Sequence, residues 1–459
     1  MNILKKIKMK KYNMLKDAPG ASLFFFALPM ILGNLFQQLY NMADSVIVGR
    51  FVGEDALAAV GASYSLTTVF IMIAIGGGIG ASVITSQYLG AKEYKKMKTS
   101  VYTALTSFAV VSVILGIFGF IMCRTILELL HTPANILASA VVYLRIYFVG
   151  LPFLFMYNIL SAIFNALGNS KTPLYLLIFS SVLNVLLDLV MVLWFGMGVA
   201  GVAVATVMVQ GLSAVISLLL LLRSLKSYDA GEAGGTGRAV LFRMDMLGSM
   251  VRIAIPSMLQ QSIVSIGMLL VQSVVNGFGS SVLAGYASGT RIESICIVPM
   301  IAMGNAMSTF TAQNMGAGSI DRVKRGYRAA YGIVFGFAAV ILIVLSLFHG
   351  EIISIFIEEG GMQAFATGDA YLVFIRFFFV MIGLKAITDG VLRGAGDVGV
   401  FTLANLVNLG IRVFISFQFA GIWGVKAVWY AIPMGWTANY LISFLWMLTG
   451  KWSKKRIIS

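Results

Sequence analysis

The second half of this 459-residue chain repeats the first half at an offset of about 226 residues. Four pairs of segments carry the repeat: 27–29 (ALP) and 254–256 (AIP), 87–91 (QYLGA) and 313–317 (QNMGA), 165–169 (NALGN) and 393–397 (RGAGD), 198–202 (GVAGV) and 421–425 (GIWGV). The repeated segments lie in or beside hydrophobic stretches long enough to span a bilayer. Duplicated membrane halves that face each other across a central cleft are common in secondary transporters. The repeat therefore predicts a transport architecture.

The composition places the chain among integral membrane proteins. Hydrophobic residues make up 59% of it and charged residues only 11%, which is too apolar for a soluble protein of this length. About 20 apolar residues cross the hydrocarbon core as a helix, which satisfies its own backbone hydrogen bonds there. We predict an all-α fold of twelve transmembrane helices in two pseudo-symmetric six-helix bundles. The predicted ranges are 22–49, 57–83, 100–123, 137–160, 172–196, 199–223, 251–276, 283–310, 327–349, 367–391, 398–420 and 425–449.

The net charge of +15 follows the predicted topology. Most of the 33 basic residues fall in segments on one side of the membrane. These segments are 5–16, 92–98, 171, 223–252, 322–328, 393 and 451–456. By the positive-inside rule this side is cytoplasmic, and so are both termini. A basic surface can also attract nucleic acid, but this distribution predicts no nucleic-acid partner.

The segment between the two halves, from Lys226 to Arg238, is polar and rich in glycine. Such a stretch cannot span a membrane and should be flexible, so it marks the boundary between two lobes. We expect a cytosolic basic tail (1–21), an N-terminal six-helix lobe (22–224), a cytosolic linker (225–248), a C-terminal six-helix lobe (249–450) and a second cytosolic basic tail (451–459). The expected location is the plasma membrane.

Residues of the kind that catalyse reactions or bind cofactors are few. Cys123 and Cys296 lie in or near different spans, which does not fit a disulfide framework or a metal knuckle. The two histidines, His131 and His349, sit near the outer ends of helices, and no nucleophile–base grouping is visible. The run 76–80 (GGGIG) lacks the Lys-Ser/Thr ending of a phosphate loop and predicts close helix packing. We expect no enzyme activity and no cofactor.

The first predicted helix carries a stripe of polar side chains. Its members are Asn34, Gln37, Gln38, Asn41 and Asp44. Spacings of three and four residues place them along one face of the helix. Two interpretations stay open: a hydrogen-bonded seam between helices, for which one or two amides are enough, or the wall of a water-filled pathway. Five polar positions that end in a carboxylate favour the pathway.

The fifth predicted helix carries Asn184 and Asp188 four residues apart, hence on one face. At about 1.5 Å per residue from the cytoplasmic end, Asp188 and Asp44 both fall in the outer half of the bilayer, and Thr206 of the sixth helix lies at similar depth. Two carboxylates with an amide and a hydroxyl suit a proton or a sodium ion, because a site of low polarity disfavours two bare negative charges. The alternative is that amide donors hold these carboxylates for structural reasons.

The duplication provides an internal comparison for this site. With one gap allowed, Asn184 and Asp188 correspond to Asn408 and Arg412, so the second half keeps the amide and replaces the acid by a base. The seventh predicted helix also carries amides but no acid. Ion coupling is therefore predicted in the N-terminal lobe.

The chain resembles the multidrug and toxic compound extrusion (MATE) transporters, and specifically their prokaryotic DinF-like branch, over essentially all twelve spans. The likeness rests on motifs that stand in the expected order and on the expected helices. These are Pro29, Gln37 and Asp44 in the first helix, 90–91 (GA) after the second, Asn184 and Asp188 in the fifth, Thr206 in the sixth, 291–293 (RIE) in the eighth, 313–318 (QNMGAG) and 393–397 (RGAGD). Each motif alone is weakly specific, whereas the combination is strongly specific.

The resemblance implies an efflux antiporter whose two bundles form a V-shaped central cavity. Transporters of this family expel amphipathic, often cationic, compounds as protons or sodium ions enter. By the same resemblance, Asp44, Asn184, Asp188 and Thr206 form the cation-coupling site, with Tyr143 nearby. A coupling sodium ion would bind at Asp44 and Asp188.

The resemblance also suggests residues for substrate binding and for a hinge. We assign Gln37, Asn41 and Glu293 to substrate binding, and Glu293 matches an acid that lines the other lobe in this branch. Pro29 matches the proline at which the first helix bends when the cation site changes occupancy. We expect small amphipathic or cationic substrates, contact with membrane lipid and a monomer.

The chain departs from the NorM-like branch of the family, which places acidic coupling residues in helices seven and ten. Helix seven has no acid here. Asp389 in helix ten lies near the cytoplasmic end, where we expect it to pair with Arg393 or Lys385. We interpret Arg145, Arg376 and Lys385 as residues paired with acids or helix ends, or extended toward the interface, in preference to contacts with an anionic substrate.

Other membrane functions remain alternatives at this point. A flippase of the same broad fold, which moves a lipid-linked precursor, would favour a strongly cationic cavity, whereas the predicted cavity carries Asp44, Asp188 and Glu293. A channel would show uncoupled flux. A receptor would need a signalling domain, which the sequence lacks.

Overall fold

The computed structural model describes residues 12–228, 239–357 and 361–455. Within these ranges the chain is helical and contains no β-strand, as its long apolar segments predict. Part of the predicted linker, at 229–238, and parts of the two basic tails, at 1–11 and 456–459, lie outside the described residues.

The N-terminal half contains the helices of the first six predicted spans. They are α1 (Pro19–Ile47), α2 (Glu54–Gly90), α3 (Tyr94–Leu129), α4 (Ala134–Val149), α5 (Leu151–Ala166), α6 (Lys171–Leu189) and α7 (Gly198–Lys226). Two short π-helical turns, η1 (Val48–Val52) and η2 (Val190–Trp194), directly follow α1 and α6.

The C-terminal half repeats this order with its own breaks. Its helices are α8 (Met244–Asn276), α9 (Ser280–Cys296), α10 (Val298–Gly316), α11 (Ile320–Ser354), α12 (Met362–Ile375), η4 (Arg376–Phe378), α13 (Phe379–Ala395), α14 (Val398–Trp423), α15 (Lys426–Leu448) and η5 (Lys451–Lys454).

These helices supply the twelve predicted spans. In the described part of the chain, ten helical segments are long and apolar enough to cross a membrane, and α4 with α5 makes an eleventh that bends by 52°. The remaining helix, α15, has 23 residues and packs along α14 and α13. Its tryptophan and tyrosine residues make it less apolar than the others, but its length and packing make it the twelfth span.

Three predicted spans are interrupted. The fourth breaks at Gly150 between α4 and α5, the eighth at Ile297 between α9 and α10, and the tenth at η4. Pro152 and Pro299 stand in the first turns of α5 and α10, where a proline fits but cannot continue the preceding helix. The sequence analysis predicted each span as one range, because apolar length alone does not show a bend.

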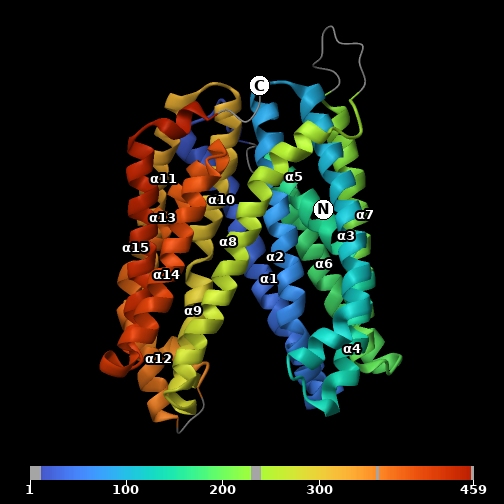
Figure 1. Ribbon diagram of the computed structural model, residues 1–459, viewed down its shortest axis with the longest axis vertical. Coiled ribbons are helices and arrows are strands. Elements are labelled where there is room, and N and C mark those ends of the chain that lie inside the picture. The colour runs from blue at the N-terminus through green and yellow to red at the C-terminus, as the bar shows by residue number, and fades with distance from the viewer. Residues whose placement is uncertain (1–11, 229–238, 358–360, 456–459) are drawn as a thin grey trace, which may run out of the picture.

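Figure 1 shows two groups of helices that meet at one end and diverge toward the other. The end where they meet, at the top of Figure 1, holds the turns after α2, α5, α10 and α13 and the ends of α7 and α8 that adjoin the linker in sequence. Because most basic segments of the sequence fall there, we call it the basic end. The other end is called the opposite end.

Two helices cross from one group to the other, as Figure 1 shows for α1 and α8. Near the basic end, Leu23, Phe26 and Ala27 of α1 are buried in the core of the C-terminal half. Met250 and Ile253 of α8 are buried in the core of the N-terminal half. The exchange obeys the sequence repeat, since Leu23 and Phe26 correspond to Met250 and Ile253. Each half therefore completes the core of the other.

The glycine run predicted to pack closely lies where α8 crosses α2. A Cβ atom added to Gly80 would lie 2.4 Å from the backbone oxygen of Met250, and one added to Gly76 would lie 2.7 Å from the Cα atom of Met258. Neither position has space for a side chain. The prediction of close helix packing is confirmed, and the run joins the two halves of the molecule.

Candidate functional site

Two acidic side chains meet where α1 packs against α6. Asp44 comes from the part of α1 toward the opposite end and Asp188 from the last turn of α6. Their carboxyl groups lie within hydrogen-bonding reach of each other. Each helix changes to a π-helical turn shortly after its acid, at Val48 and at Val190. Such turns frequently occur at functional sites.

An amide, a phenol and a backbone N–H complete the surroundings of this acid pair. In the amide orientation that satisfies both ends of Asn184, its Nδ2 atom donates to Asp188 Oδ2 at 3.0 Å and to the Tyr40 hydroxyl at 2.7 Å. Its oxygen accepts from the backbone N–H of Thr206 at 3.2 Å. The predicted group of Asp44, Asn184, Asp188 and Thr206 is thus one cluster, drawn from α1, α6 and α7.

Asp188 is buried, Asp44 is half-buried, and neither acid has a basic partner. The side chain of Asp188 is fully buried, and Asn184 is 2% exposed. The Oδ1 atoms of both Asp44 and Asp188 are buried without a hydrogen-bond partner. Among the described residues, no lysine or arginine forms an ion pair with either acid. Two adjacent carboxylates in an apolar medium need a proton or a metal cation to offset their charge.

The oxygen atoms of the cluster fit either kind of cation. Carboxylate, amide and hydroxyl oxygens are the ligands that hard metal cations prefer. The described part of the chain contains no group of three or more His, Cys, Asp or Glu side chains that could hold a metal ion. A sodium ion at Asp44 and Asp188 would therefore draw its other ligands from neutral oxygens such as those of Asn184, Thr206 or the backbone. A proton needs only the carboxylates.

Tyr143 lies beside the acid pair, as predicted, but a second phenol is the one bonded to the cluster. It lies on α4, close to both Asp44 and Asp188, and no hydrogen bond joins it to either acid among the described residues. The phenol bonded to the cluster is Tyr40, through Asn184. The sequence analysis missed Tyr40, although it stands four residues before Asp44 and hence on the same face of the helix.

The polar stripe of α1 divides into two parts. Asn34, Gln38 and Asn41 are exposed, so they do not form a hydrogen-bonded seam with another helix. Gln37 donates to Asn41 at 3.2 Å within α1. The structure gives Gln37 no hydrogen bond to Asp44, which faces α6.

Glu293 lies in the other half of the molecule, on α9. Its Oε2 atom accepts a hydrogen bond of 2.5 Å from Tyr371 of α12. The Tyr371 ring in turn lies 5.6 Å from the ring of Tyr286 and 5.8 Å from that of Trp429, measured between centroids. A carboxylate among aromatic rings is a surrounding that suits an aromatic or cationic group. The tyrosine partner was not predicted, because no local spacing links α12 to α9.

Arg412, the base that corresponds to Asp188 under the repeat, packs between α14 and α15. Asn408 and Arg412 lie on the face of α14 that packs against Gly435 of α15. A Cβ atom added to Gly435 would lie 2.2 Å from Asn408 Oδ1 and 3.0 Å from Arg412 Cγ. The C-terminal half therefore does not repeat the acid pair at this place.

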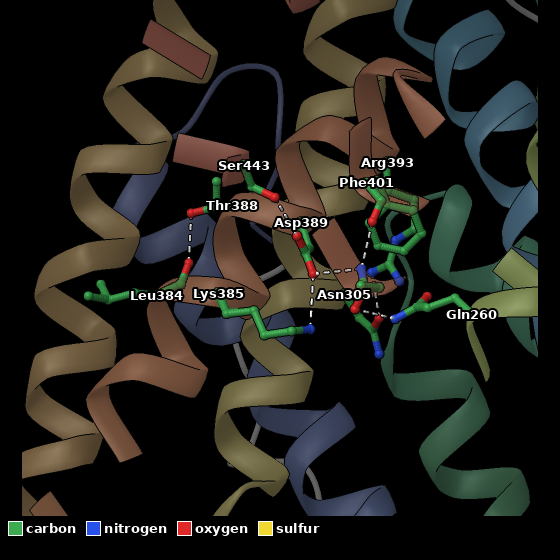
Figure 2. A network of polar contacts seen from close by, with 10 residues as sticks. Gln260, Asn305, Leu384, Lys385, Thr388, Asp389, Arg393, Phe401 and Ser443 are labelled. Carbon is green, nitrogen blue, oxygen red and sulfur yellow. Dashed lines mark hydrogen bonds and ion pairs between the residues drawn. The ribbon is translucent and has the colours of Figure 1, made fainter. Parts of the chain in front are cut away.

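Figure 2 shows a second polar cluster, in the C-terminal half around Asp389. Lys385 Nζ lies 3.0 Å from Asp389 Oδ2, and Asn405 donates to the same oxygen at 3.3 Å. Ser443 donates to Asp389 Oδ1 at 3.0 Å. The predicted pairing of Asp389 with Lys385 is confirmed. Because both carboxylate oxygens are bonded to neighbouring helices, the cluster holds α13, α14 and α15 together.

Arg393, the other partner considered for Asp389, bonds elsewhere. It donates to Asn305 Oδ1 at 2.8 Å and to Ser308 Oγ at 3.2 Å, both on α10 (Figure 2 labels Asn305 and Arg393). Arg393 therefore joins α13 to α10 and does not form an ion pair with Asp389.

Pro29 marks the place where α1 changes partners. It stands inside α1 and is buried. Phe26 and Ala27, just before it, pack in the core of the C-terminal half, whereas the later part of α1 packs along α6. A proline inside a helix removes one backbone hydrogen bond and favours a bend. The predicted hinge thus lies between the acid pair and the segment of α1 held by the other half.

Comparison with known proteins agrees with this architecture. The MatE family pattern matches residues 29–190 and again 256–417, which are the two halves of the repeat. The probable multidrug resistance protein YpnP of Bacillus subtilis is 29% identical over 453 residues, covering 98% of this chain and all of that protein.

Solved structures share the fold. One described as the outward-facing conformation of a multidrug resistance MATE family transporter of the MOP superfamily superposes with a TM-score of 0.86 at 23% identity, covering 97% of this chain and 99% of that one. A MATE structure in the straight conformation gives a TM-score of 0.88 at 22% identity, with the same coverage. Both halves of the chain match the family pattern, and the helices and their order match solved members. The chain therefore belongs to the MatE family of membrane transporters.

Proposed function

We propose that this protein is an antiporter of the plasma membrane that exports small amphipathic, often cationic, compounds while protons or sodium ions enter. The observation that carries the proposal is the pair formed by the half-buried Asp44 and the buried Asp188. A pair of carboxylates without a basic partner is costly at bilayer depth, and it becomes acceptable when a cation binds. Binding and release of that cation can therefore drive a change of conformation.

The proposed substrate pathway lies along α1 and α9. Asn34, Gln38 and Asn41 are exposed on α1, and polar side chains at this depth are expected to face water, not lipid. Glu293 with Tyr371 offers a charge and aromatic surface from the other half. The relative from Bacillus subtilis carries the description of a probable multidrug resistance protein, which supports an organic substrate. Gln37 and Asn41 are proposed as contacts on the N-terminal wall.

We further propose that the functional lobes are 22–224 and 249–450, with the linker 225–248 and the tails 1–21 and 451–459 in the cytosol, and that the protein works as a monomer. The basis is the charge of the basic end, which the positive-inside rule assigns to the cytosol. With this orientation, the two groups of helices diverge toward the outside (Figure 1).

The decisive experiment is efflux from proteoliposomes with the proton and sodium gradients imposed separately. Purified protein is reconstituted, a cationic dye is loaded, and release is followed under each gradient. We expect one gradient to drive release and the other to have little effect. Release driven by neither gradient, for any of several cationic dyes, would contradict antiport.

The proposed orientation predicts that a short tag at either terminus is accessible only from the cytosol. Intact cells that carry a cysteine-containing tag are treated with a membrane-impermeant thiol reagent, before and after permeabilisation. Labelling is expected only after permeabilisation, because both tails lie on the basic side. Labelling in intact cells would reverse the topology. The matched control places the cysteine at the α3–α4 turn, which should react in intact cells.

Glu293→Gln is expected to change which compounds are exported more than it changes ion coupling. Glutamine keeps the volume but removes a negative charge that attracts cationic ligands, and the acid pair on α1 and α6 stays intact. Export of a cationic substrate should fall about tenfold relative to a neutral one, which corresponds to about 1.4 kcal/mol of lost attraction. The measurement compares both substrates and the coupled ion flux in the same proteoliposomes.

The control for this variant is Glu351→Gln, which removes an exposed acid of α11 outside the proposed pathway. It should leave the ratio of the two substrates unchanged. If Glu293→Gln instead reduces both substrates equally and also removes the ion flux, Glu293 belongs to the coupling site and the proposed division between the halves is wrong.

A further inference from the structure

The two halves of the protein are joined at the basic end by a reciprocal pair of glutamine hydrogen bonds. Gln87 at the end of α2 donates through Nε2 to the backbone oxygen of Gly394 at the end of α13, at 3.2 Å. Gln313 at the end of α10 donates through Nε2 to the backbone oxygen of Ala166 at the end of α5, at 2.8 Å. Both bonds connect one half to the other.

The two bonds join equivalent positions of the sequence repeat. Gln87 corresponds to Gln313, and Ala166 corresponds to Gly394. The glutamine of each half therefore reaches the same carbonyl position in the other half. Both side chains are buried, with exposed fractions of 2% for Gln87 and 3% for Gln313.

The accepting carbonyls are the ones a helix leaves free. The last four carbonyl groups of an α-helix have no partner within the helix. Ala166 is the last residue of α5, and Gly394 is the last but one of α13. A buried carbonyl without a partner is costly. The Ala166 carbonyl also accepts from Ser86 Oγ of its own half at 3.1 Å, whereas Gln87 is the side chain, among the described residues, that bonds the Gly394 carbonyl.

Glycines allow the helices that carry the glutamines to touch by their backbones. A Cβ atom added to Gly90 of α2 would lie 1.8 Å from the backbone oxygen of Gln313, and one added to Gly316 of α10 would lie 1.9 Å from that of Gln87. Again the contact is reciprocal under the repeat. At these two positions the helices meet through backbone atoms, so this particular contact holds no side chain that must repack when it opens.

We propose that Gln87 and Gln313 are positioning residues that hold the basic end closed and set the balance between this arrangement and one in which the basic end is open. When the end opens, both amides and both carbonyls become hydrated, so the bonds favour closure only moderately. Each contributes about 1 kcal/mol, which is a factor of about five in the population of the open arrangement. Because the two glutamine bonds are this weak, binding of a cation at the acid pair can still decide whether the basic end is closed or open.

The proposal rests on the transport function proposed above, but its test measures accessibility and not transport. Cys123 and Cys296 are replaced by serine, and a reporter cysteine is introduced at Ala312, a fully buried residue of α10 that packs in the core of the N-terminal half. The rate at which a maleimide labels this cysteine in purified protein reports the population of the open arrangement. A second reporter at Ala140, fully buried in the N-terminal half on α4, reports general loosening.

Gln87→Ala and Gln313→Ala are each expected to raise the labelling rate at position 312 about fivefold, and their combination by about twenty-five-fold if the two bonds act independently. The rate at position 140 should not change. Gln87→Met and Gln313→Met keep the side-chain volume and lose the donor, so they should act in the same way even if the alanine variants fold poorly. Gln272→Ala, which removes a glutamine bonded only to Asn276 in its own helix, should leave both rates unchanged.

Equal increases at positions 312 and 140 would show that the glutamines merely stabilise the fold, and the proposal would be overturned. Unchanged labelling at position 312 in the folded methionine variants would overturn it as well. Failure of gradient-driven efflux, in contrast, would count against antiport and not against the proposed role of Gln87 and Gln313.

Discussion

Asp188→Asn and Asp44→Asn are each expected to reduce gradient-driven efflux to the background of protein-free liposomes, while insertion into the membrane stays intact. Asparagine keeps the size of the side chain but holds neither a proton nor the negative charge that attracts a sodium ion. The remaining carboxylate then stands beside a neutral amide and loses the like-charged neighbour that makes cation binding favourable. The measurement is dye efflux under the driving gradient, with the coupled ion flux recorded in parallel.

A matched control separates coupling from charge in general. Asp321→Asn removes an acid at the start of α11 whose side chain is 91% exposed, and it should transport normally. Normal efflux by Asp44→Asn or Asp188→Asn would remove that residue from the coupling site. Loss of efflux together with loss of folded protein would point to the structural interpretation of the pair.

Gly80→Leu is expected to cause the largest loss of stability among single substitutions at the crossing of α2 and α8. Even a Cβ atom at this position would lie 2.4 Å from the backbone oxygen of Met250, so the two helices must move apart. Overpacking of a close contact typically costs 1–3 kcal/mol, and a clash with backbone belongs at the upper end, about 3 kcal/mol. The measurement is the midpoint of thermal unfolding in detergent.

Gly336→Leu provides the comparison for this substitution. Gly336 lies on α11, and a Cβ atom added there meets nothing within 4 Å. Both variants add the same side chain to a transmembrane helix, but only Gly80→Leu should lower the midpoint. Similar midpoints for the two variants would mean that α2 and α8 tolerate separation at this point.

The number and order of the helices could be predicted from apolar length and from the repeat. These two signals are local or periodic, and they give the same twelve spans that the structure contains. The breaks at Gly150 and Ile297 escaped the prediction, although Pro152 and Pro299 stand just after them. A proline in an apolar run is compatible with a continuous kinked helix or with a new helix, and the packing of neighbouring helices decides between them.

In the candidate site, too, contacts within one helix could be predicted from the sequence and contacts between distant helices could not. Asn184 and Asp188, or Lys385 and Asp389, stand four residues apart on one helix, so their proximity follows from helix geometry. The contact between Glu293 and Tyr371 joins two helices that are distant in sequence, and no periodicity in one sequence shows which side chains meet across such an interface. Tyr40 escaped notice for another reason: the stripe was defined by amides and acids, and tyrosine was counted with the apolar residues.

The crossing of α1 and α8 has a consequence for biosynthesis. α1 is the first helix to leave the ribosome, yet Leu23 and Phe26 find their burial among helices made from the second half of the message. Met250 and Ile253 of α8, in contrast, reach a core whose other buried members, apart from Ala312 of α10, already exist when they are inserted. The N-terminal half can thus form most of its packing when α8 arrives, while the start of α1 waits for the later helices of the second half. Chains cut within 229–238 should accordingly yield two fragments that neither fold fully alone nor separate once assembled.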